Sequence, residues 1–413
     1  MILSLVVIAA VTGVWALVAG RLRRWHVQLP LVMVLAGIVV GLHPGNTVVE
    51  TLNSEVAQHA AEVILAVLLF VDATKIGGGR LLGDEPGLAV RMLVLALPLS
   101  IAVAFLLGAV LLPATFGWPA LLLIACMLVP IDLNPAESLL AGGFVPARVR
   151  GVLSVESGYN DGFVSPVFAF ALILAGTSSQ ADTPMEALGT AVPSAVTAIV
   201  SGLLFGAAIA SLMNVTQRAG WMTGQSRRIA VVVAPLLSYT ATVAVGGNGF
   251  VASFVCGITF RYLREVVPRR RIKEVHTTDD LQLLEDVTAL LTIGMWLYLG
   301  NATVLAVRDG VSWRIVLFCV AVLTVVRFVP VQLAAIGSAL SRRERLALAA
   351  IGPRGTSSVV FGLLAFNDLP AGELADTALT AMTITVVGGV LLFGGLPVGL
   401  VDRAVSRVRK QPC

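Results

Sequence analysis

The chain contains 413 residues, of which 57% are hydrophobic and only 13% are charged. This composition excludes an ordinary water-soluble domain and indicates an all-α polytopic membrane protein. The small basic excess, a formal net charge of +4, is the kind that loops facing anionic lipid carry, so lipid is the implied partner and nucleic acid is not indicated.

Thirteen apolar segments of roughly 20 residues, each about long enough to cross ~30 Å of hydrocarbon, follow one another along the chain. They begin near residues 2, 30, 56, 91, 118, 151, 188, 229, 248, 281, 313, 346 and 376. Of the 28 Lys and Arg residues, all except Arg308, Arg314, Arg327 and Arg354 then fall on one side of the membrane. Because cytoplasmic loops collect basic residues, we predict an outside N-terminus, an inside C-terminus and a short basic C-terminal tail.

The segments that connect these spans are too short to fold by themselves. Residues 1–413 are therefore expected to form a single membrane domain. The four cysteines have no paired spacing, so the sequence predicts neither a disulfide framework nor a resident metal or other cofactor.

Two spans contain residues that a lipid-facing helix would not tolerate. The fifth contains Pro130 and Pro135, and the twelfth contains the run Gly-Pro-Arg-Gly at 352–355. Both helices are predicted to break near mid-membrane, and paired broken helices in two halves of a chain point to a transporter's binding site. Because spans five and twelve differ by seven, we predict two inverted six-helix repeats with broken crossing helices.

The sixth span carries two carboxylates, Glu156 and Asp161, inside an otherwise apolar stretch. An ionisable side chain at membrane depth persists where it pairs with another charge or binds an ion. Asp161 is the predicted carrier, because a carboxylate that holds either a proton or a cation, but not both, couples the two fluxes. Ser157 and Asn160 place neutral oxygens close to it on the same helix.

Asp132 lies in the break of the fifth span, and two roles are open for it. Carbonyl groups freed by the break can join its carboxylate in binding a hard cation. Alternatively, the carboxylate satisfies backbone donors and organises a helix end. The predicted ion- and proton-binding residues are therefore Asp161, Asp132, Ser157 and Asn160, with the two carboxylates on the transported cation.

Glu156 and Arg354 are predicted to form a structural ion pair, because two unpaired charges of opposite sign in facing spans would each be expensive. Asn160 is expected to join this brace and to fix the turn that presents Asp161. We expect Arg327 to be a packing or pairing charge of the eleventh span. Asp72 is expected to end the third span near the cytoplasm.

Three strings in the chain resemble motifs of one family, the NhaP-like sodium/proton antiporters of the cation/proton antiporter 1 branch. Glu-Ser-Gly-Tyr-Asn-Asp-Gly at 156–162 is similar to their Asn-Asp motif, and Gly-Pro-Arg-Gly-Thr-Ser-Ser at 352–358 is similar to their arginine motif. Leu-Leu-Phe-Val-Asp-Ala at 68–73 resembles the end of their third span. The resemblance covers nearly the whole chain and implies a homodimer.

Carried over to this sequence, the resemblance implies that Asp161 is the ion and proton carrier and that Ser157 is a ligand. It also implies that Glu156 and Asn160 are braced against Arg354.

Asp132 corresponds to the acid of the family's Thr-Asp-Pro motif. Here Ile131 replaces the threonine and Leu133 replaces the proline. The preferred cation is therefore not fixed by the resemblance.

These observations predict a multi-pass transporter of the cell membrane that exchanges a monovalent cation for protons and is not an enzyme. Sodium is the first candidate cation, with potassium and lithium as others, and exchange is expected to be electroneutral. The alternative in the same class is a sodium-coupled carrier of an organic anion on the same fold. An intramembrane hydrolase would need a base for Ser157, and no histidine lies at membrane depth to provide one.

Overall fold

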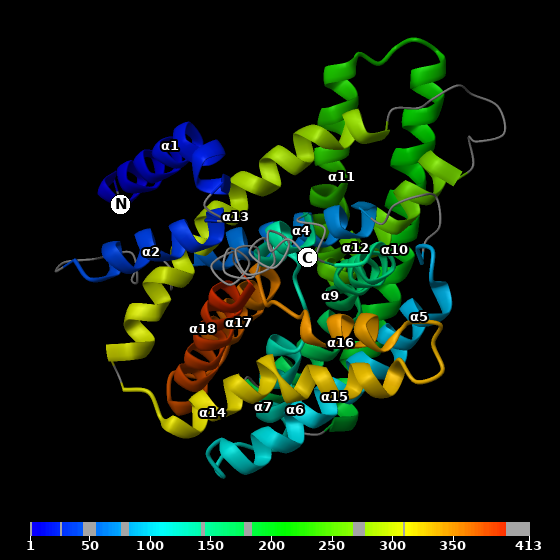
Figure 1. Ribbon diagram of the computed structural model, residues 1–413. Helices are drawn as coiled ribbons and strands as arrows, with labels where there is room; N and C mark the ends of the chain where they lie inside the picture. The colour runs from blue at the N-terminus through cyan, green and yellow to red at the C-terminus, as the bar shows by residue number, and fades with distance from the viewer. Residues whose placement is uncertain are drawn as a thin grey trace, which may run out of the picture.

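The computed structural model describes residues 2–24, 27–43, 55–75, 82–141, 145–176, 184–266, 277–308 and 310–393, and within these ranges the chain forms helices and no strands. The helices gather into one bundle (Figure 1). The predicted basic C-terminal tail lies outside the described residues.

The first half of the chain runs from α1 to the long helix α9. Its elements are α1 (Ile2–Arg24), α2 (Leu29–Gly41), α4 (Glu55–Lys75), α5 (Pro86–Arg91), η1 (Met92–Ala96), α6 (Leu97–Leu111), α7 (Trp118–Leu128), η2 (Asn134–Ala136), α8 (Glu137–Ala141) and α9 (Ala147–Ala175).

The second half runs from α10 to α18. Its elements are α10 (Pro184–Arg218), α11 (Gly224–Ala244), α12 (Gly249–Arg261), η3 (Tyr262–Val266), α13 (Thr277–Arg308), α14 (Trp313–Leu323), α15 (Val325–Ala334), α16 (Arg342–Ala350), α17 (Thr356–Asp368) and α18 (Glu373–Phe393). Each of the thirteen predicted spans overlaps one of these helices or a consecutive group of them.

Seven helices among the described residues are long and apolar enough to cross a membrane, and three shorter apolar helices accompany them. Helix α10 shows the expected surface, because Leu203, Leu204, Leu212 and Val215 are exposed along it. A row of exposed leucine and valine side chains along one helix is favoured in lipid and disfavoured in water. The chain is therefore a multi-pass membrane protein, while the predicted orientation of its termini stays a prediction.

Both predicted helix breaks are present, and they meet. Helix α7 ends at Leu128 and the chain is non-helical until η2, while 351–355 separate α16 from α17. The backbone nitrogen of Asp132 in the first break donates a hydrogen bond of 3.0 Å to the carbonyl oxygen of Pro353 in the second. The two breaks therefore satisfy each other's backbone, as an interrupted helix inside a membrane requires.

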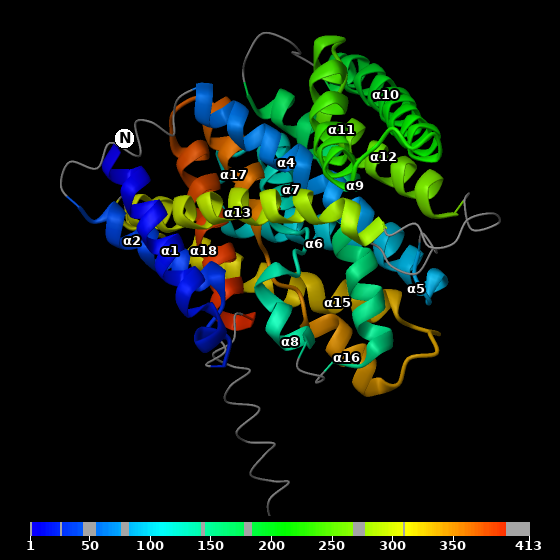
Figure 2. The same cartoon turned by 90° about the horizontal axis from the view of Figure 1, so that it is seen from above.

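Helix α13 crosses the molecule and packs against α2 and α11 (Figure 2). Its contact with α2 depends on two glycines that face each other. A Cβ added at Gly37 would lie 2.0 Å from the carbonyl oxygen of Leu297, and one at Gly300 would lie 2.1 Å from that of Val34. Glycine therefore allows these two backbones to approach as closely as helices in membranes often do.

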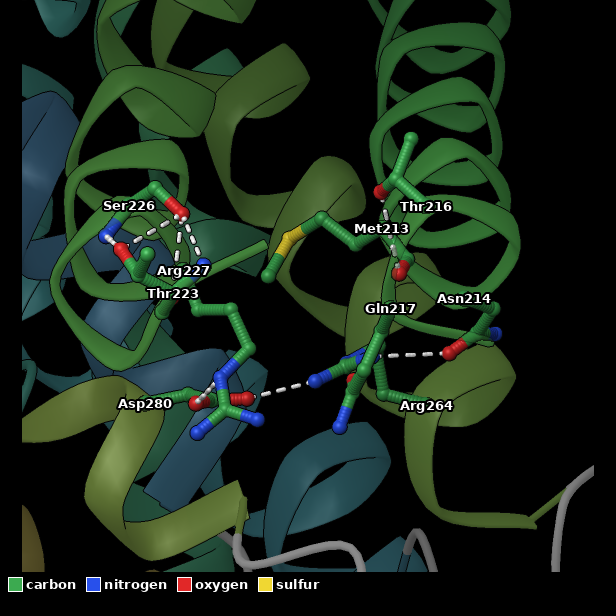
Figure 3. Close-up of polar contacts among 9 residues, drawn as sticks. All are labelled: Met213, Asn214, Thr216, Gln217, Thr223, Ser226, Arg227, Arg264 and Asp280. Carbon is green, nitrogen blue, oxygen red and sulfur yellow. Dashed lines mark hydrogen bonds and ion pairs between the residues drawn. The ribbon is translucent and has the colours of Figure 1, made fainter. Parts of the chain in front are cut away.

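The first turn of α13 is fixed by a buried charge cluster (Figure 3). Asp280 forms ion pairs with Arg264 of η3 and with Arg227 of α11. The buried Arg264 guanidinium also donates to the side-chain oxygens of Asn214 at 2.8 Å and Gln217 at 3.0 Å, both on α10. The cluster therefore joins four elements, α10, α11, η3 and α13, at one end of the bundle.

Candidate functional site

Asp161 lies in the middle of α9 and is almost fully buried, with 4% of its surface exposed. Its Oδ1 atom is completely covered and has no hydrogen-bond partner among the described residues. The carboxylates of Asp72 on α4 and Asp132 in the first break lie close enough to interact with it, and the hydroxyl of Ser357 on α17 lies within reach of a long, weak hydrogen bond. A covered carboxylate oxygen without a donor is unusual in a protein interior and leaves room for a proton or a cation.

Asp132 organises the start of α17. Its Oδ2 accepts hydrogen bonds from the backbone nitrogen and from the hydroxyl of Thr356, each at 2.9 Å, and its Oδ1 accepts from the backbone nitrogen of Asn134 at 2.9 Å. A carboxylate at this position satisfies the free N–H groups of a helix start and complements its dipole. Of the two roles left open for Asp132, the structure supports the helix organiser, and its contact with the cation stays a prediction.

Gly355 makes this capping contact possible. A Cβ at position 355 would lie 2.2 Å from Oδ2 and 2.5 Å from Cγ of Asp132. Only a residue without a side chain lets the carboxylate reach the first residue of α17.

Asn160 ties α9 to the first break. Its side-chain nitrogen donates to the carbonyl oxygen of Ile131 at 2.7 Å, and its side-chain oxygen accepts from the backbone nitrogen of Asp161 at 2.7 Å. Asn160 therefore positions the residue beside it, as predicted, but it does so through the break and not through Arg354.

The predicted ion pair between Glu156 and Arg354 is wrong. Glu156 instead receives two hydrogen bonds from Arg327 of α15, at 2.7 Å and 3.1 Å. Planar guanidinium and carboxylate groups match in this two-bond arrangement, which suits a buried pair. The expectation that Arg327 is a pairing charge is confirmed, and its partner is Glu156.

Arg354 binds backbone oxygens of the broken helices. It donates to the carbonyl groups of Leu128, of Gly352 at 2.6 Å and of Val322 at 3.3 Å. The Leu128 carbonyl belongs to the last turn of α7, where the break removes its helical partner. Arg354 therefore replaces hydrogen bonds that the broken helices lose.

Arg327 does the same for α16. Its Nε donates to the carbonyl of Ile351 at 2.8 Å and its Nη2 to that of Leu348 at 3.2 Å. The two arginines thus share the free carbonyl groups on either side of the breaks, and of the two only Arg327 also donates to Glu156.

Helix α16 enters this region from a capped start outside the spans. Ser341 and Glu344 form a reciprocal capping box, with hydrogen bonds of 3.2 Å and 2.8 Å. Hydrogen bonds from the backbone and side chain of Ser341 lower the pKa of Glu344. The helix therefore begins at a fixed residue before it reaches the break.

The remaining predicted residues have different surroundings. Ser157 is half-buried one turn before Asp161 on α9, which keeps it a candidate ligand. The Ile131 side chain packs into an apolar cluster with Val331, Leu348 and Ile351. Position 131 therefore contributes its carbonyl group to the site, through Asn160, and not its side chain.

Two residues near Asp161 were missed by the sequence analysis. The sequence predicts a span end at Asp72, yet its carboxylate lies close enough to interact with that of Asp161. Ser357 lies in the arginine motif and received no role. The available signal was that both lie inside the strings that carry the family resemblance.

Comparison with known proteins agrees with this geometry. The family model described as sodium/hydrogen exchanger, transmembrane, matches residues 6–395. The structure of the sodium proton antiporter MjNhaP1 from Methanocaldococcus jannaschii at pH 8 is similar to this chain with a TM-score of 0.74 at 18% sequence identity, covering 95% of this chain and 99% of that one. A 3D EM map of MjNhaP1 gives a TM-score of 0.71 at 17% identity, covering 95% and 96%.

At these identities the two structures establish the fold, and they confirm the predicted antiporter architecture with its broken crossing helices. The family model establishes more, because it matches nearly the whole chain. The chain is therefore a transporter and not an enzyme, and it belongs to the sodium/hydrogen exchanger family.

Proposed function

We propose that this chain exchanges one monovalent cation, most readily sodium, for one proton, and that Asp161 holds the two in alternation. The observation that carries the proposal is the covered Oδ1 atom of Asp161, which has no hydrogen-bond donor among the described residues. A proton supplies the missing partner in one state and a cation supplies it in the other. The carboxylate cannot hold both, so the two fluxes are coupled.

The surroundings of Asp132 support electroneutral exchange. Both of its oxygens accept hydrogen bonds from protein donors at the start of α17 and in the first break, so both are already occupied. If Asp132 keeps one charge state, Asp161 alone changes its occupant, and each direction of the cycle moves the same charge.

The alternative, a sodium-coupled carrier of an organic anion, is disfavoured by the charges around the site. Asp72 and Asp132 both lie close to Asp161, so an anion would meet three carboxylates. Of the two arginines nearby, Arg327 is paired with Glu156 and Arg354 donates to backbone carbonyls. Both guanidinium groups already donate to protein oxygens and would have to give up these hydrogen bonds to bind an anion.

We also propose that the chain lies in the cell membrane and that it forms the homodimer implied by the family resemblance. Homodimer formation would be measured on the purified full chain by its mass in detergent.

The proposed exchange is tested in everted membrane vesicles that contain a pH-sensitive dye. Sodium, potassium and lithium are added in turn, and the release of a preformed proton gradient is followed. We expect sodium to dissipate the gradient in the wild type and not in Asp161→Asn. Asp286→Asn makes the same chemical change at an exposed position of α13 and should behave as the wild type does. Cation-dependent proton flux in Asp161→Asn would contradict the proposal.

A further inference from the structure

Ser357 is a buried hydroxyl without a partner beside the candidate carrier. It has 3% of its surface exposed, and its Oγ atom makes no hydrogen bond among the described residues. It lies close enough to act on the Asp161 carboxylate as a weak hydrogen-bond donor, although no hydrogen bond of normal length joins it to Oδ1. Burying polar groups without full hydrogen bonds costs free energy, and a cation bound by both oxygens would remove that cost.

The packing of α9 against α17 explains why the two groups face each other. Phe168 and Phe361 pack with their ring centroids 4.5 Å apart. Ser357 precedes Phe361 by four residues and Asp161 precedes Phe168 by seven, so each lies on the helix face that carries its phenylalanine. Asp161 and Ser357 therefore lie on the facing sides of α9 and α17, each on the N-terminal side of the phenylalanine of its own helix.

Several side chains near Asp161 are already used or point elsewhere. Asp132 accepts three hydrogen bonds at the start of α17, and the side-chain oxygen of Asn160 accepts one from the backbone. The Ile131 side chain lies in an apolar cluster. An alkali cation needs several oxygen ligands, and the Ser357 hydroxyl is a free one that lies next to the carboxylate.

We propose that the Ser357 hydroxyl binds the transported cation together with Asp161, and so helps to determine the affinity for sodium. This inference rests on the proposed exchange function and assigns the cation a ligand from α17, the helix that starts at the second break. Because Asp132 and Gly355 fix where α17 begins, they also fix where this hydroxyl lies. A cation held between α9 and α17 is held by the two halves of the predicted inverted repeat.

The test compares Ser357→Thr with Ser357→Val in proteoliposomes of the purified full chain. The two side chains have the same shape, and only threonine keeps the hydroxyl. Proton flux is measured as a function of sodium concentration. The valine variant should need about tenfold more sodium for half-maximal flux, the size of one lost polar contact to a charge, with its maximal rate largely kept. The threonine variant should stay close to the wild type.

Ser358→Ala is the matched control, because Ser358 is the adjacent buried hydroxyl and likewise makes no hydrogen bond within the described part of the chain. It should leave the sodium dependence unchanged. Equal sodium dependence in Ser357→Thr and Ser357→Val would overturn the assignment, and so would an equal loss in Ser358→Ala. If the valine variant does not reconstitute, Ser357→Ala, which needs less space, takes its place.

A second measurement separates binding from turnover. Sodium bound to the folded protein should raise its unfolding temperature in detergent. The wild type and Ser357→Thr should show this rise at similar sodium concentrations, and Ser357→Val only at higher ones.

A different result would reject the proposed exchange function itself, namely exchange of sodium for protons by Asp161→Asn. If the wild type exchanges sodium, Asp161→Asn does not, and Ser357→Val matches the wild type, only the role of Ser357 is rejected.

Discussion

Asp132 and Thr356 join the two broken helices, because one carboxylate oxygen of Asp132 accepts hydrogen bonds from both the backbone nitrogen and the hydroxyl of Thr356, each at 2.9 Å. The backbone nitrogen of Asp132 donates to the carbonyl oxygen of Pro353. Asp132 therefore holds the second break by main chain and side chain together. The position of α17, and of everything α17 carries toward Asp161, depends on this residue.

The space that lets Asp132 reach α17 gives the first prediction. Gly355→Ala places a methyl group 2.2 Å from the carboxylate oxygen, so the carboxylate or the start of α17 must shift. We expect a loss of about 1–3 kcal/mol in stability, as overpacking costs elsewhere, together with slower exchange. Thermal unfolding in detergent and proton flux in vesicles measure the two effects.

Gly151→Ala on α9 is the control for this substitution. A Cβ there would meet no atom within 4 Å, so alanine should be neutral or stabilise the helix by about 0.5–1 kcal/mol. Unchanged stability in Gly355→Ala would show that the carboxylate does not depend on the absence of a side chain.

The Glu156–Arg327 pair gives the second prediction. Glu156→Gln or Arg327→Gln leaves one buried charge without a partner, which should cost about 3–5 kcal/mol of stability. The double variant should recover part of this loss, because no lone charge remains. Thermal unfolding of the purified variants measures the three values.

The exposed pair of Glu85 and Arg148 is the matched control, with side chains 31% and 43% exposed. Glu85→Gln should cost only about 0–1 kcal/mol. If the double variant at 156 and 327 is no more stable than the less stable of the two single variants, the ion pair between Glu156 and Arg327 does not stabilise this region.

The breaks of the two spans could be predicted from sequence because they depend on local chemistry. Proline at 130 and the Gly-Pro-Arg-Gly run at 352–355 cannot continue a regular helix, whatever surrounds them. The placement of Asp161 within an apolar span could be predicted for the same reason.

The partner of Glu156 could not be predicted from sequence in this way. Two buried arginines, Arg327 and Arg354, could each neutralise it, and sequence spacing does not separate them. The choice depends on where each guanidinium lies relative to Glu156 once the two breaks have met, and that requires the three-dimensional arrangement. Asp72 and Ser357 were missed for a related reason, since neither is close to Asp161 in the sequence.

Independence from membrane potential is the third prediction. A cycle that moves one net charge would gain or lose about 2.3 kcal/mol per 100 mV, whereas exchange of one cation for one proton at Asp161 moves none. In proteoliposomes with equal ion gradients, a potassium–valinomycin potential should leave the rate and end point of sodium exchange unchanged. The wild type must first be shown not to transport potassium. Voltage-driven exchange would indicate that a second carboxylate also gains and loses a proton during the cycle. Asp132 and Asp72 are the first candidates, because both lie close to Asp161.

The alternation of proton and cation at Asp161 is tested most directly by counting protons released when sodium binds. Purified protein in detergent and weak buffer is held at a pH where the wild type binds sodium only weakly, and sodium is added while a pH dye is read. The wild type and Asp286→Asn should each release protons as sodium binds, and Asp161→Asn should release none. Release from Asp161→Asn equal to that of the wild type would contradict the account, because the exchanged proton would then come from another group.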